Sequence, residues 1–417
     1  MKYVEIRELG EIITGKTPPT ENQSFYDGDY PFITPTDIES FDKKYLYSTE
    51  RTLSSLGAKK VKSCKLPAKS ICFVCIGSTI GKMCMTNCES YTNQQINSVI
   101  PNKGCDNDYL FYYLRYVNEY FRSIGAGTGS GKGIVNKTVF SKTKIQINED
   151  KKEQKRIADI LSTYDELIEN NNKRIKILEQ TAENLYKEWF VHSRFPGHET
   201  TEFENGIPKG WENTTFDVIA SFQNGYAFES KELMLESGVN TYEVFKQGHI
   251  KRGGGFKLDG TKSWYPKDFC CSLGKFILKK EDLLMAMTDM KDNVAILGNT
   301  AIMPFNDRFI LNQRVGLIRP TGYRKVGYEY IYLLTNSYDF VQDLRGRANR
   351  GVQVNLSSIQ IKLSNVLVPS CEINIKFKNI INPIFEQVFN ILNQNENLIK
   401  QRGMLLPRLM SGKLEVN

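Results

Sequence analysis

The chain has 417 residues, which is long enough for two or three domains with hydrophobic cores of their own. Its 55 Lys and Arg against 47 Asp and Glu give a formal net charge of +8, so nucleic acid is the partner class to test first. No run of about 18 apolar residues occurs and the first residues lack a signal-peptide pattern, so we expect a soluble, cytoplasmic protein rather than a membrane-spanning or exported one.

The apolar run SICFVCIG, which contains Cys72 and Cys75, predicts a buried strand. With Cys84 and Cys88 these thiols have a spacing that superficially suits zinc. Residues three apart on a strand point to opposite faces, so we interpret Cys72 and Cys75 as buried apolar side chains and keep a zinc site as the alternative. Nine cysteines, an odd number, argue against a disulfide framework.

The stretch GAGTGSGKGIVNKT, residues 125–138, has the look of a phosphate-binding loop. The motif G-x-x-x-x-G-K-[ST] requires glycine where this chain has Ala126 and a hydroxyl where it has Gly133. A predicted helix over 108–121 precedes the stretch, whereas a phosphate-binding loop follows a strand and opens a helix. A nucleotide-binding enzyme that uses residues 125–133 is therefore only an alternative hypothesis.

The chain contains an internal repeat. With an offset of 219, Asn93-Gln94 falls on Asn312-Gln313 and Asn136 falls on Asn355; further upstream an offset of 210 places Gly15 on Gly225. SICFVCIGST corresponds to EDLLMAMTDM, which has no cysteine. Two copies that share a scaffold but differ in content predict two versions of one module that recognise different things.

A helical segment with an unbroken heptad seam follows each copy. The first seam runs from Ile157 to Trp189, and adding 220 gives a second from Phe377 to Leu409. Heptads sustained this long predict a coiled coil. At about 1.5 Å per residue the first seam is roughly 48 Å long, about 14 base-pair steps of about 3.4 Å. The helical pair could therefore serve as a spacer ruler between two DNA-reading modules.

Antiparallel packing brings the two seams into register. If residue i faces residue 566 − i, Asn171 faces Asn395 and every seam residue lands on a seam residue, as a pseudo-two-fold axis between the copies requires. A buried asparagine pair costs stability but sets the register. Arg402 then faces Tyr164, and we expect this arginine at a solvated rim.

Two features at the helix ends carry further expectations. Pro383 and Pro407 predict that the second helix is bent or broken near its start and its end. Tyr186, Trp189 and Phe190 exceed what one seam can bury. We expect part of this aromatic cluster to pack on module two or on a partner subunit, with ordinary core as the alternative.

These segments together resemble the specificity (S) subunit of type I restriction-modification systems over essentially the full chain. The resemblance rests on LGEIITGKTPPT followed by YPFITPTDI, on GIPKGWE, on the NQQIN and NQRVG boxes, on EQKRIADILSTYDELIENNNKRIKILEQTAENLYKEWF and on LLPRLMSGKL. It implies an α+β fold in which two similar target-recognition domains are separated by two long antiparallel coiled-coil helices. The expected boundaries are residues 1–148 for target-recognition domain 1 (module one), 149–192 for the central conserved helical region, 193–369 for the linker with target-recognition domain 2 (module two), and 370–417 for the C-terminal helical region.

The resemblance implies a non-catalytic subunit that reads a bipartite site in double-stranded DNA. An adenine methyltransferase needs a [DN]-P-P-[YF] box. The nearest stretch, residues 17–20, is Thr-Pro-Pro-Thr and lacks both the Asp or Asn and the aromatic residue of that box. We therefore expect that this chain catalyses nothing and binds no cofactor. S-adenosylmethionine, ATP and magnesium would be used by partner subunits, namely two modification (methyltransferase) subunits and, in the full complex, restriction subunits.

Polar and basic loop residues are the candidates for DNA contact, because Arg and Lys pair with guanine, Asn and Gln with adenine, and all of them with phosphate. For any one of them a solvated surface role is the alternative. The candidates are Lys16, Thr17, Thr34, Thr36, Ser78, Thr79, Lys82, Ser130, Lys132 and Lys137 in module one, and Gln223, Asn224, Lys246, Thr288, Asp289, Lys291, Arg345, Arg347, Arg350 and Gln353 in module two. The shared Asn93-Gln94 and Asn312-Gln313 are instead expected to be structural amides that cap the backbone.

The loop at 125–138 has RGRANRGVQVNLSS, residues 345–358, as its counterpart, with Asn136 and Asn355 expected to anchor the two loops identically. Exchange of glycine for arginine suits a loop that lies near a DNA backbone. A coiled-coil scaffold without sequence-specific DNA binding is the remaining alternative.

Overall fold

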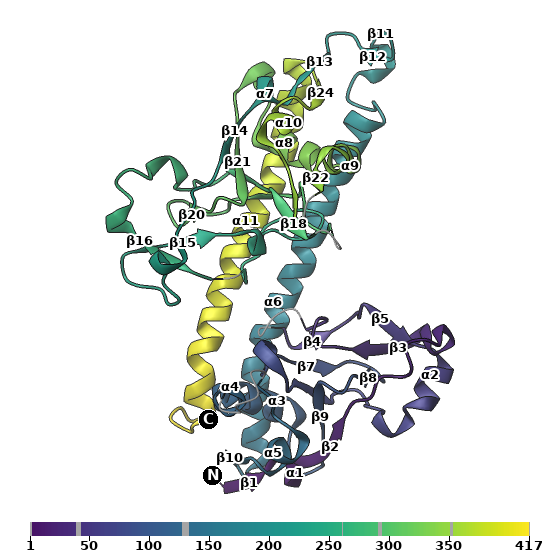
Figure 1. The fold of residues 1–417 in the computed structure, drawn as a ribbon, viewed down its shortest axis with the longest axis vertical. Coiled ribbons are helices and arrows are strands. Elements are labelled where there is room, and N and C mark those ends of the chain that lie inside the picture. Colours follow the sequence, from purple (N-terminus) through teal and green to yellow (C-terminus); the bar gives the residue numbers. More distant parts are fainter. Residues whose placement is uncertain are drawn as a thin grey trace. The chain divides into compact units, whose positions relative to one another are not determined.

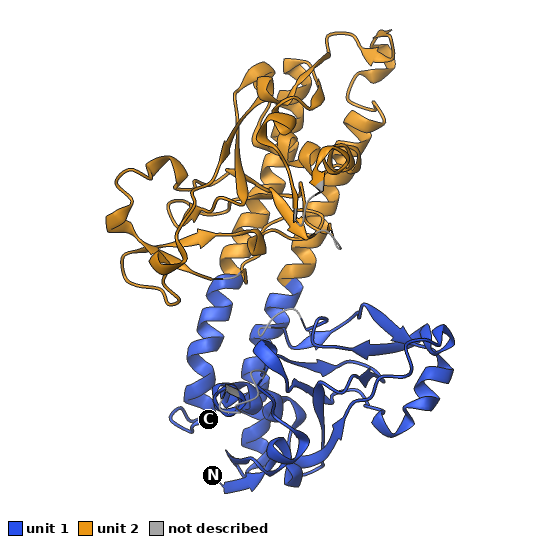
Figure 2. Cartoon of the chain, in the orientation of Figure 1, with its two compact units in different colours: residues 1–170, 395–417 blue, residues 171–394 orange. Residues whose placement is uncertain are grey.

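The computed structural model describes residues 2–38, 43–126, 133–260, 262–290, 294–350 and 353–416. The chain divides into two compact units, unit 1 with Met1–Asn170 and Asn395–Asn417 and unit 2 with Asn171–Gln394 (Figure 2). The two long helices, α6 (Lys151–Tyr186) and α11 (Cys371–Met410), each contribute to both units. They begin close to the predicted helical boundaries, but the units do not follow the predicted four-part division, which stays a prediction.

Unit 1 contains a five-stranded sheet of order β2-β9-β6-β7-β4, a three-stranded sheet of order β5-β3-β8 and the pair β1-β10 (Figure 1). Its strands and helices, besides parts of α6 and α11, are β1 (Lys2–Glu5), α1 (Ile6–Leu9), β2 (Gly10–Thr14), β3 (Tyr26–Ile33), β4 (Tyr45–Leu46), β5 (Arg51–Leu53), α2 (Ser55–Lys60), β6 (Ile71–Val74), β7 (Met83–Thr86), β8 (Tyr91–Thr92), β9 (Ile96–Pro101), α3 (Asn107–Tyr116), α4 (Asn118–Ala126), α5 (Lys137–Lys142) and β10 (Lys144–Ile147).

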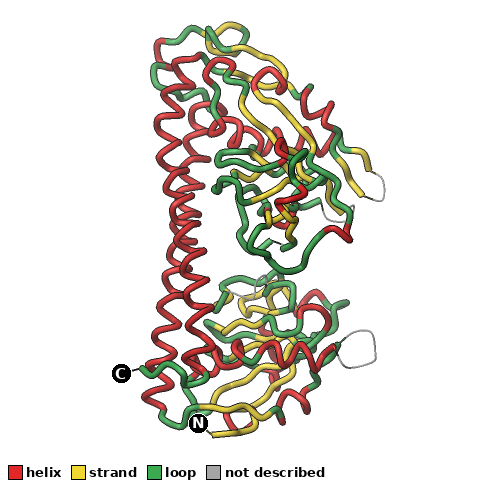
Figure 3. Tube along the Cα trace, turned by 90° about the vertical axis from the view of Figure 1, so that its left-hand side faces the viewer, coloured by secondary structure: helices red, strands yellow, loops and turns green. Residues whose placement is uncertain are grey.

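Unit 2 contains a four-stranded sheet of order β14-β21-β17-β19, three-stranded sheets of order β16-β15-β20 and β18-β23-β22, and the pairs β13-β24 and β11-β12. Its elements, besides parts of α6 and α11, are β11 (Phe203–Glu204), β12 (Ile207–Pro208), β13 (Glu212–Thr215), α7 (Phe216–Ile219), β14 (Ala220–Asn224), β15 (Thr241–Phe245), β16 (Trp264–Pro266), β17 (Leu283–Ala286), β18 (Thr288–Met290), β19 (Thr300–Ile302), β20 (Phe309–Leu311), β21 (Val315–Pro320), α8 (Tyr328–Thr335), α9 (Tyr338–Arg347), β22 (Asn349–Arg350), β23 (Gln353–Asn355), α10 (Ser358–Lys362) and β24 (Asn365–Val368). Figure 3 shows that in each unit the strands lie to one side of the two long helices.

Strand pairing shows the same module twice. Gly10 pairs with Pro101 where β2 meets β9, and Ala220 pairs with Pro320 where β14 meets β21, which are the predicted offsets of 210 and 219. The parallel pairs β3–β8 and β15–β20 also correspond. The predicted fold class, α+β with two similar modules and two long helices, is therefore confirmed.

The correspondence is wrong in two places. Ile76 bridges Ile134 in module one, and the equivalent Thr288 pairs with Asn355, so Asn355 corresponds to Ile134 and not to Asn136. Asn136 accepts the Val139 N–H at 2.9 Å and caps α5, whereas Asn355 lies in β23. The two loops are thus not anchored identically. The stretches from α4 to α5 and from α9 to α10 both span ten residues, so the extra residues of module two lie upstream of the loop, where a gapless comparison cannot register them.

The second error in the predicted correspondence concerns the strand with Cys72, β6, and its counterpart β17. Ile71 pairs with Val99 and Leu283 with Ile318, so the predicted alignment of the two strands is one residue out. The interpretation of the thiols holds: Cys72 packs in a cluster with Val74, and Cys75 packs in the separate cluster that contains Phe73. The two side chains therefore lie on opposite faces of β6, both buried.

Helices α6 and α11 begin in the same way. The Asp150 carboxylate accepts the Lys152 N–H at 2.8 Å, and the Ser370 hydroxyl accepts the Ile373 N–H at 3.4 Å, as N-cap residues do. The predicted break is wrong, because α11 runs without interruption from Cys371 to Met410, and a bend at either proline stays a prediction. Pro383 lies between the buried Ile381 and Phe385, whose packing holds the helix despite the lost hydrogen bond.

The antiparallel pairing of the helices holds in each unit taken by itself. In unit 1, Ile157 of α6 shares a core with Leu409 of α11. In unit 2, the rings of Trp189 and Phe377 lie 5.5 Å apart. Asn171 and Asn395 are both buried, and their pairing stays a prediction.

The aromatic cluster at the end of α6 packs on module two, as expected. Phe190, in a π-helix that follows α6, lies 5.8 Å from Trp211 and 5.0 Å from Tyr330, centroid to centroid. The expected rim position of Arg402 is wrong: its side chain is 4% exposed and forms an ion pair with Asp165. Across the described ranges, no helix combines the length and apolar character needed to span a bilayer.

Candidate nucleic-acid interface

Each module has a short turn between two strands that we call the central turn, residues 93–95 in module one and 312–314 in module two. In module one the Asn93 side-chain oxygen accepts the Gln95 N–H at 3.1 Å, and the Asn93 carbonyl accepts the Ile96 N–H at 3.2 Å. In module two the Asn312 side-chain oxygen accepts the Arg314 N–H at 3.3 Å. The predicted capping role of the two asparagines is confirmed.

Three other segments meet the central turn of module one. The Asn93 N–H donates to Ile33 O at the end of β3 at 3.2 Å, and Gln95 O accepts the Cys75 N–H after β6 at 2.9 Å. The Thr17 hydroxyl, after β2, donates to the Gln94 side-chain oxygen at 2.7 Å. The ends of β2, β3 and β6 therefore meet at one turn.

Module two repeats the two backbone contacts and has a backbone contact in place of the side-chain one. The Asn312 N–H donates to Phe245 O at the end of β15 at 3.2 Å, and Arg314 O accepts the Met287 N–H after β17 at 3.1 Å. The Gln313 N–H donates to Tyr226 O after β14 at 2.8 Å. The backbone of the two edges is thus the same while the side chains differ.

A glycine directly after β2 in module one, and directly after β14 in module two, allows the strand end to lie close to the central turn. A Cβ atom on Gly15 would lie 2.2 Å from Thr92 O, and one on Gly225 would lie 2.1 Å from Asn312 O. Any side chain would push the strand end off the central turn. Glycine stands at this position in both copies of the repeat, as the close approach requires.

The glutamines of the central turn were expected to cap backbone, and this is wrong. Gln94 and Gln313 are exposed, and Gln94 bonds to the Thr17 side chain instead. Because the preceding asparagine folds back onto the turn, the next side chain points outward. Both glutamines are therefore available to a ligand that approaches this edge.

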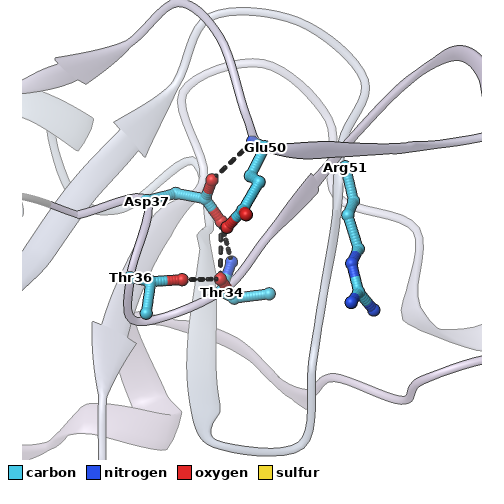
Figure 4. A pocket seen from close by; sticks show the side chains of 5 residues that line it. All are labelled: Thr34, Thr36, Asp37, Glu50 and Arg51. Atoms are coloured by element: carbon cyan, nitrogen blue, oxygen red, sulfur yellow. Dashed lines mark hydrogen bonds between the residues drawn. The ribbon is translucent and has the colours of Figure 1, made fainter. Parts of the chain in front are cut away.

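The segment after β3 forms a polar pocket of about 230 Å³ next to the turn (Figure 4). The Asp37 carboxylate accepts the N–H and the hydroxyl of Thr34 at 2.8 and 2.6 Å, and the Glu50 N–H at 2.7 Å. Thr36 is exposed and its hydroxyl lies 2.7 Å from that of Thr34. Figure 4 shows the Arg51 side chain apart from this hydrogen-bonded group, with no hydrogen bond drawn to it.

Module two has the same turn after β15 with different residues. The Lys246 N–H donates to His249 Nδ1 at 3.1 Å, as the Thr34 N–H donates to Asp37. His249 is buried, and its Nε2 lies 3.4 Å from Glu243. Burial lowers the pKa of the half-buried Lys246, so this position carries a lysine partly withdrawn from water.

The remaining candidates of module one lie on or near the same edge. Lys16 and Ser78 are exposed just beyond the ends of β2 and β6, while the Thr79 hydroxyl donates to Ile76 O at 3.1 Å and Lys82 is half-buried. Lys137 is exposed at the start of α5. Ser130 and Lys132 lie outside the described residues.

Two module-two candidates turn out to have structural partners. The Asp289 carboxylate accepts the N–H groups of Ile296 and Leu297 at 2.7 and 3.1 Å. The Arg345 guanidinium donates to Leu297 O and Ala295 O at 3.0 and 3.2 Å. These two side chains hold the segment before β19 in place.

The other module-two candidates are dispersed. The Gln223 amide donates to Lys275 O at 3.3 Å, Thr288 accepts a hydrogen bond from Gln247 at 2.7 Å, and Asn224 is exposed. Arg347 forms an ion pair with Asp343 one helical turn earlier. Arg350 and Gln353 lie in β22 and β23 with side chains that are not described, and Lys291 lies outside the described residues.

Residue type alone missed Arg51 and Arg314. Both are exposed, and within the described part of the chain neither guanidinium has an ion-pair partner. Arg314 follows the shared Asn312-Gln313 pair, and Gln95 stands at the equivalent position of module one. A position that differs between the copies directly after a shared pair could have indicated Arg314 as a candidate DNA contact.

Comparison with known proteins shows the family to which the chain belongs. A family model described as type I restriction modification DNA specificity domain matches residues 1–180 and 208–401, once for each module. The chain is 26% identical over 431 residues to the type I restriction enzyme MjaIX specificity subunit of Methanocaldococcus jannaschii, covering 99% of this chain and 93% of that protein. It is 37% identical over 142 residues to the HindI specificity subunit of Haemophilus influenzae, covering 34% of this chain and 30% of that protein.

Among solved structures, the S subunit of a type I restriction-modification system from M. genitalium matches with a TM-score of 0.53 and 15% identity, covering 98% of this chain and 96% of that one. At this identity the match shows that the fold is shared.

Proposed function

We infer the function of this chain from its family: it belongs to the type I restriction-modification DNA specificity family and is a specificity subunit of such a system. We propose that it catalyses nothing itself, and that each module reads one half of a bipartite site in double-stranded DNA. The observation that carries this proposal is the central turn, whose backbone contacts recur in both modules while the side chains around it differ. A shared frame with different contents suits two half-sites of different sequence.

The proposed reading edge of module one consists of exposed or half-exposed side chains around residues 93–95. They are Lys16, Thr17, Arg51, Ser78, Thr36 and Gln94. In module two the corresponding set around residues 312–314 is Asn224, Lys246, Gln313 and Arg314. Arg and Gln can make bidentate contacts to guanine and adenine, and Lys and Ser suit phosphate oxygens.

The long helices have a separate role in this proposal. Their length sets the distance between the half-sites, and their outer faces bind two modification subunits, with restriction subunits in the full complex. Support comes from apolar side chains left exposed on these faces, Ile177 at 65% and Leu167 at 46% on α6 and Ile380 at 46% on α11. S-adenosylmethionine, ATP and magnesium belong to the partner subunits in this proposal.

Methylation mapping of the source strain with and without this gene tests the proposal. Loss of one bipartite methylation motif on deletion is the expected result. Exchange of residues 1–148 for the equivalent module of a relative should then change one half of the motif and leave the other half and the spacer length. No change in methylation on deletion, or a change in both halves on exchange, would refute it.

A further inference from the structure

A buried ion pair joins the two long helices in unit 1. Arg402 of α11 donates to one oxygen of Asp165 of α6, and the two side chains are only 4% and 8% exposed. The Tyr112 hydroxyl of α3 donates to the other oxygen, and Arg115 lies 4.0 Å from it. The carboxylate is therefore held by both the partner helix and module one.

The equivalent positions of unit 2 are apolar. Asp165 corresponds to Phe385 and Arg402 to Ala182, each with the helix offset of 220. Phe385 is 1% exposed and Ala182 is fully buried. With the module offset of 219, Tyr112 corresponds to the buried Ile331. The helices thus form a buried ion pair in unit 1, whereas the equivalent side chains in unit 2 are apolar.

Stability does not explain this difference. Burying two charges costs desolvation free energy that their attraction roughly offsets, so an apolar pair of similar size would be as stable or more stable. Loss of one partner from a buried pair is a different matter, because the remaining charge is then buried without compensation. The pair therefore discriminates between partner helices more than it stabilises the correct one.

The repeat offers an incorrect partner. Since α6 and α11 are versions of one helix, α6 could pack in the same antiparallel manner on α6 of a second copy of this chain, and α11 on α11. Asp165 would then face Ala182 of the second copy, and Arg402 would face Phe385. Arg402 would lose its charge partner and be buried against hydrocarbon, while Asp165 would lose Arg402 and keep only the contacts with Tyr112 and Arg115 of its own module.

We propose that the Asp165–Arg402 pair makes α6 select α11 and reject the like helix of a second copy. The pair thereby keeps two different modules together in one assembly. Pairing of like helices would join two identical modules, so under the proposed function the pair also keeps the two half-sites different. The pairing preference itself does not depend on DNA binding.

Refolding of the full-length chain tests the proposal. The chain is unfolded in guanidinium chloride and refolded by dilution at increasing protein concentrations, and light scattering after size exclusion gives the monomer and dimer fractions. The test variant, Asp165→Phe with Arg402→Ala, installs the residues of unit 2, so that like and unlike pairings become equally apolar. Its dimer-to-monomer ratio should exceed that of the unchanged chain at least about tenfold at equal concentration.

Two further variants complete the test. Asp165→Glu with Arg402→Lys keeps a pair of opposite charges beside Arg115 and Tyr112 and so keeps the preference for the unlike helix, and this chain should remain as monomeric as the unchanged one. Asp165→Asn with Arg402→Met removes both charges at nearly constant volume and should dimerise like the test variant, which covers failure of Asp165→Phe to refold. The proposal is overturned if the uncharged variants stay monomeric, or if the variant with the retained Glu–Lys pair dimerises as much as they do.

Discussion

The two central turns have the same backbone and different side chains. In both modules a glycine, Gly15 or Gly225, allows the end of β2 or β14 to approach the turn. An asparagine, Asn93 or Asn312, caps the backbone of the turn. Positions that hold the backbone are therefore repeated, whereas neighbouring positions that point outward are free to differ. The comparison separates residues that build the edge from residues that would read DNA.

The largest effect is expected where the backbone approach is closest. Gly15→Ala and Gly225→Ala each place a Cβ about 2 Å from a backbone oxygen, and each should lower the free energy of unfolding by about 3 kcal/mol in denaturant titrations. Gly346→Ala is the control, because a Cβ there meets nothing within 4 Å and a helix favours alanine. A neutral effect at either central turn would show that the close approach is not required.

The cores of the two modules differ at a titratable position that lies in α3 of module one and in α8 of module two. Glu329 is 1% exposed, its counterpart at the offset of 219 is the buried Leu110, and burial raises the Glu329 pKa to about 6. Since the folded-state pKa is raised, the carboxylate lowers stability as pH rises from about 4.5 to 6, by about 2 kcal/mol above that range. Glu329→Leu should stabilise the chain more at pH 8 than at pH 4.5 by this amount, as measured by urea unfolding at both pH values.

Glu329→Gln is the matched control for this pH dependence, because it removes the charge and keeps the shape. Like Glu329→Leu, it should abolish the difference in stability between pH 4.5 and pH 8 that Glu329 causes. An unchanged pH profile in both variants would place the titrating group elsewhere.

The caps themselves should have smaller and equal effects. Asn93→Ala and Asn312→Ala each remove one side-chain hydrogen bond that holds the turn, at a cost of about 1 kcal/mol of unfolding free energy. Asn136→Ala, at a cap found only in module one, gives a reference of similar size. Markedly unequal effects of the two turn substitutions would show that the repeated geometry does not have a repeated role.

Much of the fold could be predicted from the sequence because subtraction of residue numbers reveals the repeat and the heptads reveal the helix pairing. The prediction failed where a gapless comparison met an insertion, at Asn136 and Asn355. It failed at Arg402 because its partner Asp165 lies one residue away from the heptad seam, and the pairing rule considers only seam residues.

The candidate site was less predictable for a related reason. Asp289 and Arg345 were selected by residue type, but their partners are backbone groups that come together only in the folded chain. The exposure of Gln94 likewise depends on how Asn93 folds back, which residue type does not reveal.

The smallest expected effects are those on phosphate contact. Lys16→Ala in module one and Arg314→Ala in module two should each weaken binding of site-containing DNA by less than about tenfold and reduce the slope of log affinity against log salt by about 1. Titrations of the assembled complex at several salt concentrations measure this. Lys209→Ala, a control on an exposed lysine paired with Glu202, should leave the slope unchanged.

The most direct test of the central claim is the methylation specificity of two paired variants, assayed with the modification subunits on a DNA library randomised at every position of the site. Gln94→Ala with Arg51→Ala should relax the preference for bases in one half-site. Gln313→Ala with Arg314→Ala should relax the other half-site, and neither should alter the spacer length. Relaxation of the same half by both variants, or of both halves by either, would contradict the assignment of one half-site to each central turn.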